Sequence, residues 1–515
     1  MALPSWLSPI YDAAEMRASD AWAIEDQGVP SLELMEAAGS ALAARAGELA
    51  GSGPVRIVCG KGNNAGDGFV AARLLADGGH GVEVLLLWPP GELSGDAATN
   101  LSRAERFSRQ IEPEELSAAL AGSGAVVDAV FGTGFSGTPR PPADAAIEAM
   151  NSCGAPLVAA DIASGVDGGT GEVQGAAVEA QVTVTFHEAQ IGHWISPGKW
   201  HSGQVEVAKI GIPSGAPLEP AAGLIGGKVL ELLPERGARS NKFSSGQVLI
   251  VGGSKGLTGA ACMAAEAAIR AGAGYAKVAV PAELEGIFEV KLTEVMSIGC
   301  PAADGALVPE AAKGILKAAE GAAAVVLGPG MGRTEAAFEL ARDLASQIEA
   351  PLLIDADGLN AHAGLLESLK ARSAPTILTP HAGELARLLE CPTTEVAARR
   401  VESAREAAER SGAIVTLKGD DTLITDGARL AVNGLAAPGL ATAGTGDVLS
   451  GAIAALLARG LGPFEAACAG VHAHARAGRH AADAVGVSSV IATDVIVSLP
   501  FGLTLGNGPT ASRAT

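Results

Sequence analysis

The stretch Ala443-Gly444-Thr445-Gly446-Asp447 predicts a glycine-rich turn that leads into a helix beginning at Val448. Glycines at alternate positions let backbone N–H groups surround an anion, and the positive end of the following helix points at the same place. A carboxylate there would repel a bound phosphate, but it suits a site where a hydroxyl loses its proton beside a phosphoryl group in transfer. The alternative interpretation is a helix start with an aspartate cap.

Length and composition predict a two-domain α/β protein. The chain has 515 residues, of which 48% are apolar and only 3% aromatic, which suits layers that pack through small residues. The formal net charge of -21 argues against a nucleic acid or an anionic membrane surface as a partner. The six cysteines form no Cys-x-x-Cys pair, so we expect reduced thiols and a cytoplasmic protein, without a signal peptide or a membrane span.

Short apolar runs alternate with helical stretches in both halves, as in parallel sheets that are covered on both faces. We predict a first domain over residues 1–212, a linker with one short helix over 213–235, a second domain over 236–505 and a flexible tail over 506–515. The expected strands are residues 55–59, 82–87, 125–130, 157–160, 182–186 and 205–209, then 247–251, 276–280, 325–327, 352–354, 376–378 and 414–417.

In the first half, polar clusters follow three of the expected strands. Gly60, Gly62 and Ala65 have the spacing of a dinucleotide fingerprint, but no acid ends the next strand, so an ordinary nicotinamide-dehydrogenase site is not expected. Asp128 and Asp161 end the other two strands. Each aspartate alone could cap a helix or brace a turn. Together, at the carboxyl ends of parallel strands, the clusters predict one crevice.

These motifs resemble those of the NAD(P)H-hydrate epimerase family over roughly residues 8–212, including residues 34–39. The resemblance implies a Rossmann-like fold that interconverts the R and S forms of hydrated NADH and NADPH. It also implies a potassium ion held by Asn64, Asp128 and Ser164. Asp161 is our candidate for the acid that assists epimerisation. The residues that would line the substrate are Asn63, Asn64, Ala65, Gly66, Asp67, Gly132, Thr133, Gly134, Phe135, Ser136, Gly137, Thr138 and Asp161.

The chain departs from this family at three positions. Ala65 stands where the family usually has Gly, Ala163 where it has Pro, and Gln190 where a Lys is common. The last change removes a cation from beside the expected crevice, so it bears most on epimerase activity.

In the second half, an ordered series of polar clusters again follows the expected strands. Alone, His381 could cap a helix, Asp355 and Asp357 could be turn residues, and Lys418 could lie on the surface. The series as a whole predicts a crevice at the strand ends. Its members are Asn241-Lys242, Gly252-Gly253-Ser254, Gly328-Pro329-Gly330, residues 355–360, Thr379-Pro380-His381, Lys418-Gly419 and Gly444-Thr445-Gly446-Asp447.

The series resembles the ADP/ATP-dependent NAD(P)H-hydrate dehydratase family of the ribokinase-like superfamily over roughly residues 236–500. The resemblance implies an α/β/α sandwich. Ala382 stands where Pro is usual, and Asp420-Asp421 add negative charge, which we expect Mg²⁺ to offset. The implied nucleotide-binding residues are Lys418, Gly419, Asp420, Asp421, Thr422 and Gly446, and the implied substrate contacts are Ala260, Gly330, His381 and Asp447.

The hypothesis is a repair enzyme for hydrated NADH and NADPH (NADHX and NADPHX). Hydroxide is a poor leaving group, so ADP or ATP would phosphorylate the ring hydroxyl of the S epimer while Asp447 accepts its proton. The first domain would supply the S epimer from the R epimer. We expect a homo-oligomer of four or eight chains. The alternatives are a ribokinase-type small-molecule kinase with an accessory nucleotide-binding domain, and a nucleotide-binding scaffold with inactive sites.

Overall fold

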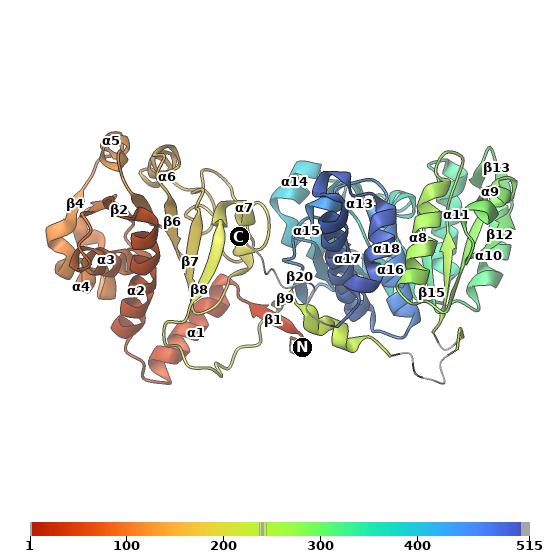
Figure 1. The fold of residues 1–515 in the computed structure, drawn as a ribbon, viewed down its shortest axis with the longest axis horizontal. Coiled ribbons are helices and arrows are strands. Elements are labelled where there is room, and N and C mark those ends of the chain that lie inside the picture. Colours follow the sequence, from red (N-terminus) through yellow and green to blue (C-terminus); the bar gives the residue numbers. More distant parts are fainter. Residues whose placement is uncertain (1–2, 236, 238–240, 244, 506–515) are drawn as a thin grey trace. The chain divides into compact units, whose positions relative to one another are not determined.

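The computed structural model describes residues 3–505 except 236, 238–240 and 244, and it divides the chain into two compact α/β units (Figure 1). One unit comprises Pro9–Ala222, and the other begins at Gly223 and also includes Leu3–Ser8. The predicted class, α/β with two domains, is confirmed. The tail expected over residues 506–515 lies outside the described residues. Among the described helices, none is long and apolar enough to cross a membrane.

The first unit contains a seven-stranded sheet in the order β4-β3-β2-β5-β6-β7-β8, and the pairings along it are parallel. This order places β2, β5 and β6 side by side, so the three polar clusters expected at their ends do meet at one edge. The strands are β2 (Val55–Cys59), β3 (Val82–Leu86), β4 (Ser108–Gln110), β5 (Ala125–Ala129), β6 (Leu157–Ala160), β7 (Val182–Phe186) and β8 (Gln204–Ala208).

Helices cover both faces of this sheet. The neighbours Ile57 and Val58 of β2 belong to two different hydrophobic cores, as the two-residue period of a strand requires. The first core includes Leu42 and Phe69 of α2 and α3, and the second includes Ile147 of α6. The helices are α1 (Ala13–Glu25), α2 (Ser31–Ala50), α3 (Asn63–Asp77), α4 (Gly95–Ala104), α5 (Leu116–Leu120), α6 (Ala143–Ser152) and α7 (Gly198–Ser202).

The second unit is built on an eleven-stranded sheet in the order β1-β9-β20-β19-β18-β17-β16-β15-β10-β11-β12. Its central pairings are parallel, while β19 pairs antiparallel with β18 and β20, so the sheet is mixed. The strands are β1 (Leu7–Ile10), β9 (Ala222–Ile225), β10 (Gln247–Val251), β11 (Tyr275–Pro281), β12 (Met296–Cys300), β15 (Ala324–Leu327), β16 (Leu352–Ile354), β17 (Thr376–Leu378), β18 (Ile414–Leu417), β19 (Leu423–Thr425) and β20 (Leu430–Val432), beside a separate hairpin of β13 (Ala302–Ala303) and β14 (Ala306–Leu307).

Two strands of this sheet come from segments that were predicted to lie elsewhere. The expected linker over 213–235 contains β9 as well as a short 3-10 helix, η5 (Gly227–Leu232). Strand β1 comes from the segment assigned to the first domain, yet its Leu7 lies in the core of the second unit. Both strands are only four residues long, too short to show a period, and burial of Leu7, Ala222 and Ile225 explains their pairing.

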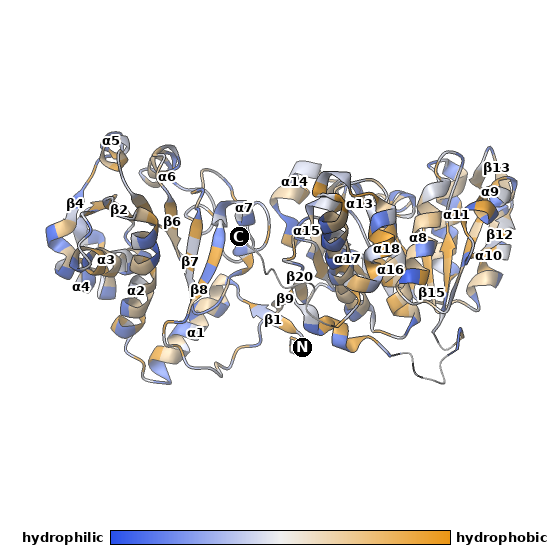
Figure 2. Ribbon diagram, in the orientation of Figure 1, coloured by the Kyte–Doolittle hydropathy of each residue, from blue (hydrophilic) through white to orange (hydrophobic). Residues whose placement is uncertain are grey.

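One core of the second unit joins α8, α16, α17 and α18 to one face of the sheet. Val326 of β15 belongs to this core, while its fully buried neighbours Val325 and Leu327 face the other side, so both faces are covered. Figure 2 shows β15 in the hydrophobic colour. The helices are α8 (Thr258–Arg270), α9 (Glu285–Lys291), α10 (Ala312–Ala319), α11 (Glu335–Gln347), α12 (Asp357–Asn360), α13 (Ala382–Leu389), α14 (Thr393–Ala398), α15 (Arg400–Ser411), α16 (Thr445–Ala458), α17 (Pro463–Val485) and α18 (Ala492–Gly502).

Candidate functional site

The glycine-rich stretch of the second unit forms the start of α16, which begins at Thr445 and not at the predicted Val448. Gly444 is its N-cap at a φ of 91°, where a side chain would be strained and where a Cβ would lie 2.6 Å from Cε of Met263. Thr445 Oγ1 donates to the carbonyl oxygen of Leu440 at 2.8 Å. Asp447 therefore lies in the first helical turn, beside the unpaired N–H groups of the helix.

Lys418 connects three elements at this point. Its Nζ lies 2.9 Å from Oδ1 of Asp355 after β16 and 3.7 Å from Oε2 of Glu384 on α13. A Cβ on Gly446 would lie 3.5 Å from the same Nζ. Ser450 of α16 donates to the other oxygen of Asp355 at 2.7 Å. Lys418 is thus a charge held at the helix start by buried carboxylates, and the alternative of a surface lysine is wrong.

The acidic surroundings shift the titration of Asp447. Burial and the negative charge of Asp355 raise the pKa of Asp447 to about 7, although Lys418 opposes part of the shift. Burial lowers the pKa of Lys418, but Asp355 and Glu384 outweigh that effect and raise it overall. A carboxyl that titrates near neutral pH at an anion-binding helix start is suited to accept a proton from a bound hydroxyl.

His381 caps α13, so the capping role considered for it is real. Its Nδ1 accepts hydrogen bonds from the backbone N–H groups of Gly383 at 3.0 Å and Glu384 at 3.3 Å. The neutral ring therefore carries its proton on Nε2, and burial lowers the pKa of the ring. An isolated parallel bridge joins His381 to Lys418, which places the histidine at the same edge of the sheet.

The remaining predicted residues of this crevice fall into two groups. Ala260 and Gly330 are neighbours, because a Cβ on Gly330 would lie 3.1 Å from that of Ala260. Gly419 and Thr422 form a tight turn after β18, in which Thr422 Oγ1 donates to the carbonyl of Gly419 at 2.7 Å.

Asp421 does not add the negative charge that was expected at this turn. Its Oδ1 lies 2.9 Å from Nη2 of Arg400 on α15, and both side chains are buried. The charge of Asp421 is therefore balanced within the protein. Nothing in the sequence marks Arg400 as its partner, because only the fold brings α15 against the turn.

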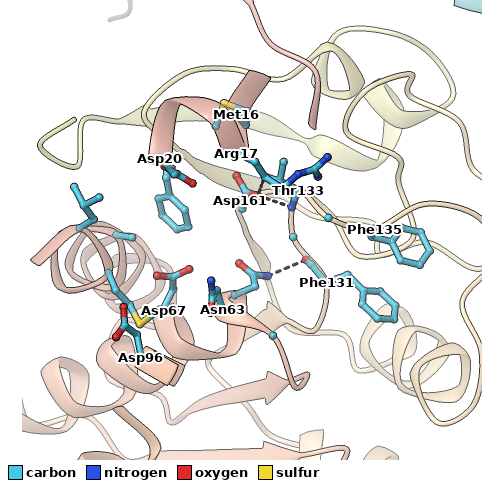
Figure 3. A pocket seen from close by; sticks show the side chains of 18 of the residues that line it. Met16, Arg17, Asp20, Asn63, Asp67, Asp96, Phe131, Thr133, Phe135 and Asp161 are labelled. Atoms are coloured by element: carbon cyan, nitrogen blue, oxygen red, sulfur yellow. Dashed lines mark hydrogen bonds between the residues drawn. The ribbon is translucent and has the colours of Figure 1, made fainter. Parts of the chain in front are cut away.

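The first unit holds a pocket of about 670 Å³ at the ends of its central strands (Figure 3). Of the predicted residues, Ala65, Gly66, Gly137 and Thr138 do not line it. Residues that the sequence did not mark also line it, among them Met16, Arg17, Asp20, Ile24, Trp88 and Asp96. The predicted residues that do line it are Asn63, Asn64, Asp67, Gly132, Thr133, Gly134, Phe135, Ser136 and Asp161.

Asp161 is fixed in this pocket by donors on both carboxylate oxygens. Oδ2 accepts from the backbone N–H of Thr133 at 2.8 Å and from its hydroxyl, and Oδ1 accepts from Nε2 of Gln190 at 2.8 Å and from Thr185 at 3.3 Å. His193 Nδ1 accepts from the N–H of Gln190, so its Nε2–H donates to the Asp161 carbonyl at 3.0 Å. Gln190 thus orients the aspartate as a neutral donor.

A cation site fits the residues behind the pocket. Asn64 donates through Nδ2 to the carbonyls of Phe131 at 2.8 Å and Ala160 at 3.2 Å, and its buried Oδ1 has no hydrogen-bond partner among the residues that the structure describes. Ser164 donates from its N–H and its hydroxyl to the fully buried carboxylate of Asp128, at 2.8 and 2.6 Å. An orphaned amide oxygen and a buried carboxylate are the hard oxygen donors that an alkali cation binds.

The two units and their sites define a two-domain α/β enzyme, with a parallel sheet in the first unit and a mixed sheet in the second. A family model described as NAD(P)H-hydrate dehydratase matches residues 248–500, and one described as YjeF-related protein N-terminus matches residues 31–192. The bifunctional NAD(P)H-hydrate repair enzyme Nnr of Moorella thermoacetica is 38% identical over 512 residues, which cover 96% of each chain. The chain belongs to the family of bifunctional NAD(P)H-hydrate repair enzymes.

Two further proteins illustrate the likeness. The repair enzyme Nnr of Salinibacter ruber is 38% identical over 522 residues, which cover 96% of this chain and 95% of that relative. The ADP/ATP-dependent NAD(P)H-hydrate dehydratase of Bacillus subtilis, co-crystallised with ATP and Mg²⁺, is 28% identical, and the match covers 54% of this chain and 96% of that chain with a TM-score of 0.46.

Proposed function

We propose that this chain repairs hydrated NADH and NADPH, with the epimerase in the first unit and the ADP- or ATP-dependent dehydratase in the second. Family membership supports both activities. The observation that carries the dehydratase site is the meeting of Lys418, Asp355 and Asp447 at the start of α16.

In the second unit, phosphoryl transfer makes the ring hydroxyl a leaving group. Asp447 takes the hydroxyl proton as the hydroxyl oxygen attacks the terminal phosphorus of the nucleotide and the bond to the bridging oxygen breaks, which releases AMP from ADP or ADP from ATP. N–H groups at the start of α16 stabilise the transferring group. The lone pair of the ring nitrogen then expels phosphate as the C–O bond breaks. Loss of a ring proton restores the reduced nicotinamide. Ala260, Gly330 and His381 contact this substrate, and Lys418–Thr422 with Gly446 hold the nucleotide.

Mg²⁺ would reach this site with the nucleotide. In the part of the chain that the structure describes, no group of three or more His, Cys, Asp or Glu side chains could hold a metal ion. Mg²⁺ commonly binds through substrate phosphates and few protein ligands, where it neutralises phosphate charge. Because Asp421 is paired with Arg400, the protein leaves less negative charge for Mg²⁺ to offset than the sequence suggested.

In the first unit, the substrate occupies the 670 Å³ pocket, with Asp161 as the acid that assists epimerisation. Asn64, Asp128 and Ser164 would hold K⁺, which would supply a fixed positive charge behind the loop that binds the substrate. A cytoplasmic homo-oligomer of four or eight chains stays a prediction.

One assay tests the whole proposal. A mixture of NADHX epimers is incubated with ADP or ATP and K⁺, and the absorbance of restored NADH is followed. We expect complete conversion by the wild-type chain and a loss of roughly 100-fold or more in the Asp447→Asn variant. Accumulation of a phosphorylated product without NADH would instead support the kinase alternative, and conversion of only the S epimer would show an inactive first unit.

A further inference from the structure

Helix α1 forms one wall of the epimerase pocket, although no motif in the sequence marks it. Met16, Arg17, Asp20 and Ile24 line the pocket and lie on neighbouring turns of this helix. The helix is fixed by a capping box in which Asp12 accepts from the N–H of Glu15 at 2.8 Å. Asp20 is therefore presented to the pocket by a defined element.

Of the four aspartates that line this pocket, Asp20, Asp67, Asp96 and Asp161, three differ in ways that bear on proton transfer (Figure 3). Asp161 has hydrogen-bond donors on both oxygens. Asp67 on α3 is nine-tenths buried and has no hydrogen-bond or ion-pair partner among the described residues. Asp20 also has no such partner within the described ranges, but it is partly exposed to solvent while it lines the pocket.

The electrostatic surroundings affect the pKa values of Asp20 and Asp67 differently. Partial burial and the charge of Asp161 raise the pKa of Asp20 to about 6, so both of its protonation states are accessible near neutral pH. Burial and the charges of Asp161 and Asp20 raise the pKa of Asp67 well above its ordinary value. Of the two, Asp20 is the group suited to give and take a proton.

Epimerisation, on which this inference rests as part of the proposed function, needs proton transfer on both faces of the reacting carbon. The hydroxyl must take up a proton to leave as water while the ring nitrogen lone pair forms the iminium ion. Water must then add to the opposite face and give up a proton. One group on one wall cannot serve both faces without moving the ring.

We propose that Asp20, presented by α1, is a second catalytic residue of the epimerase site beside Asp161, which follows β6. In one direction Asp161 protonates the departing hydroxyl and the ionised Asp20 takes the proton of the water that adds on the other face. In the reverse direction the two carboxyls exchange these roles. Each turnover moves one proton from Asp161 to the departing water and one from the adding water to Asp20. Exchange with solvent then returns Asp20 to its ionised form and Asp161 to its protonated form.

The test measures NADHX epimerisation in the full-length chain, with Asp20→Asn beside Asp26→Asn as a control. Asp26 follows directly after α1, is exposed and does not line the pocket. We expect Asp20→Asn to lower kcat by roughly 100-fold with little change in KM, because a general acid–base group contributes about 10²–10⁴. We also expect Asp20→Ala to regain activity when acetate is added, since acetate can replace the missing carboxyl.

A thermal melt of each variant checks that the first unit is folded. Dehydration of purified S epimer by ADP in the same samples reports on the second unit and should not change. A kcat for Asp20→Asn within about two-fold of the Asp26→Asn control would overturn the proposal, as would a rise in KM alone. If the wild-type chain itself fails to exceed the spontaneous rate, the epimerase assignment fails instead, so the two failures are distinguishable.

Discussion

At the residue scale, Asp447 links the chemistry of the second unit to the pH of the solution. Burial and Asp355 raise its pKa to about 7, and only the ionised form can accept the hydroxyl proton. We therefore predict that kcat/KM for dehydration rises with pH and levels off above pH 7, and is about ten-fold lower one unit below the pKa. The measurement is initial rates from pH 5.5 to 8.5 with saturating nucleotide. A flat profile over this range would contradict Asp447 as the base.

The same shift predicts that Asp447 lowers stability at high pH. Its folded pKa lies above the unfolded value, so the ionised side chain destabilises the folded state, and this loss grows as pH rises from about 4 to 7. Asp447→Asn should then stabilise the second unit by roughly 1–4 kcal/mol at pH 8 and by little at pH 4. Thermal melts at the two pH values measure the difference. An equal Tm for variant and wild type at pH 8 would argue against the shift.

The sequence could predict Asp447, Lys418 and Asp161 because polar residues at strand ends indicate a crevice, whichever residues they contact. It could not predict the partners. From the sequence, Gln190 mattered only because it replaces a cation. In the structure its amide donates to Asp161, because a buried turn brings the two residues together. Asp20 lies on a helix with no marked amphipathic pattern, and its place in the pocket depends wholly on how α1 packs.

At the scale of elements, α15 and the turn after β18 depend on one buried ion pair. Arg400 and Asp421 are 7% and 1% exposed, so replacing Arg400 removes this ion pair from a buried carboxylate. We predict that Arg400→Met lowers the free energy of unfolding by about 3–5 kcal/mol and raises KM for the nucleotide, because Asp421 belongs to the proposed nucleotide loop. Urea titration and initial rates measure the two effects.

Helix α15 supplies the matched control. Arg410, at its other end, pairs with Glu367 at 2.7 Å, but that glutamate is 58% exposed, and a solvated ion pair contributes little to stability. Arg410→Met should therefore change stability little and leave the nucleotide KM unaltered. Similar losses of stability in Arg400→Met and Arg410→Met would mean that burial does not determine how much the Arg400 ion pair contributes.

At the scale of the whole molecule, the order of segments along the chain does not follow the division into units. Strand β1 belongs to the sheet of the second unit, although more than 200 residues of the first unit separate it from β9, its neighbour in that sheet. The sequence-based boundary at residue 212 followed composition, which changes at the prolines of the expected linker. Composition carries no information about an edge strand of four residues that pairs across so long an insertion.

This arrangement predicts that the beginning of the chain stabilises the dehydratase more than the epimerase. Leu7 is 4% exposed and lies in the core shared by α8, α16, α17 and α18, so Leu7→Ala should cost the second unit about 2–5 kcal/mol. Residual dehydratase and epimerase activities after heating full-length protein measure the two units separately. We expect the dehydratase half-life to fall while the epimerase half-life changes little, and we expect Ser8→Ala, at the exposed neighbouring position, to alter neither. A parallel fall of both activities would show instead that the two units unfold together, which would make the chain one cooperative body.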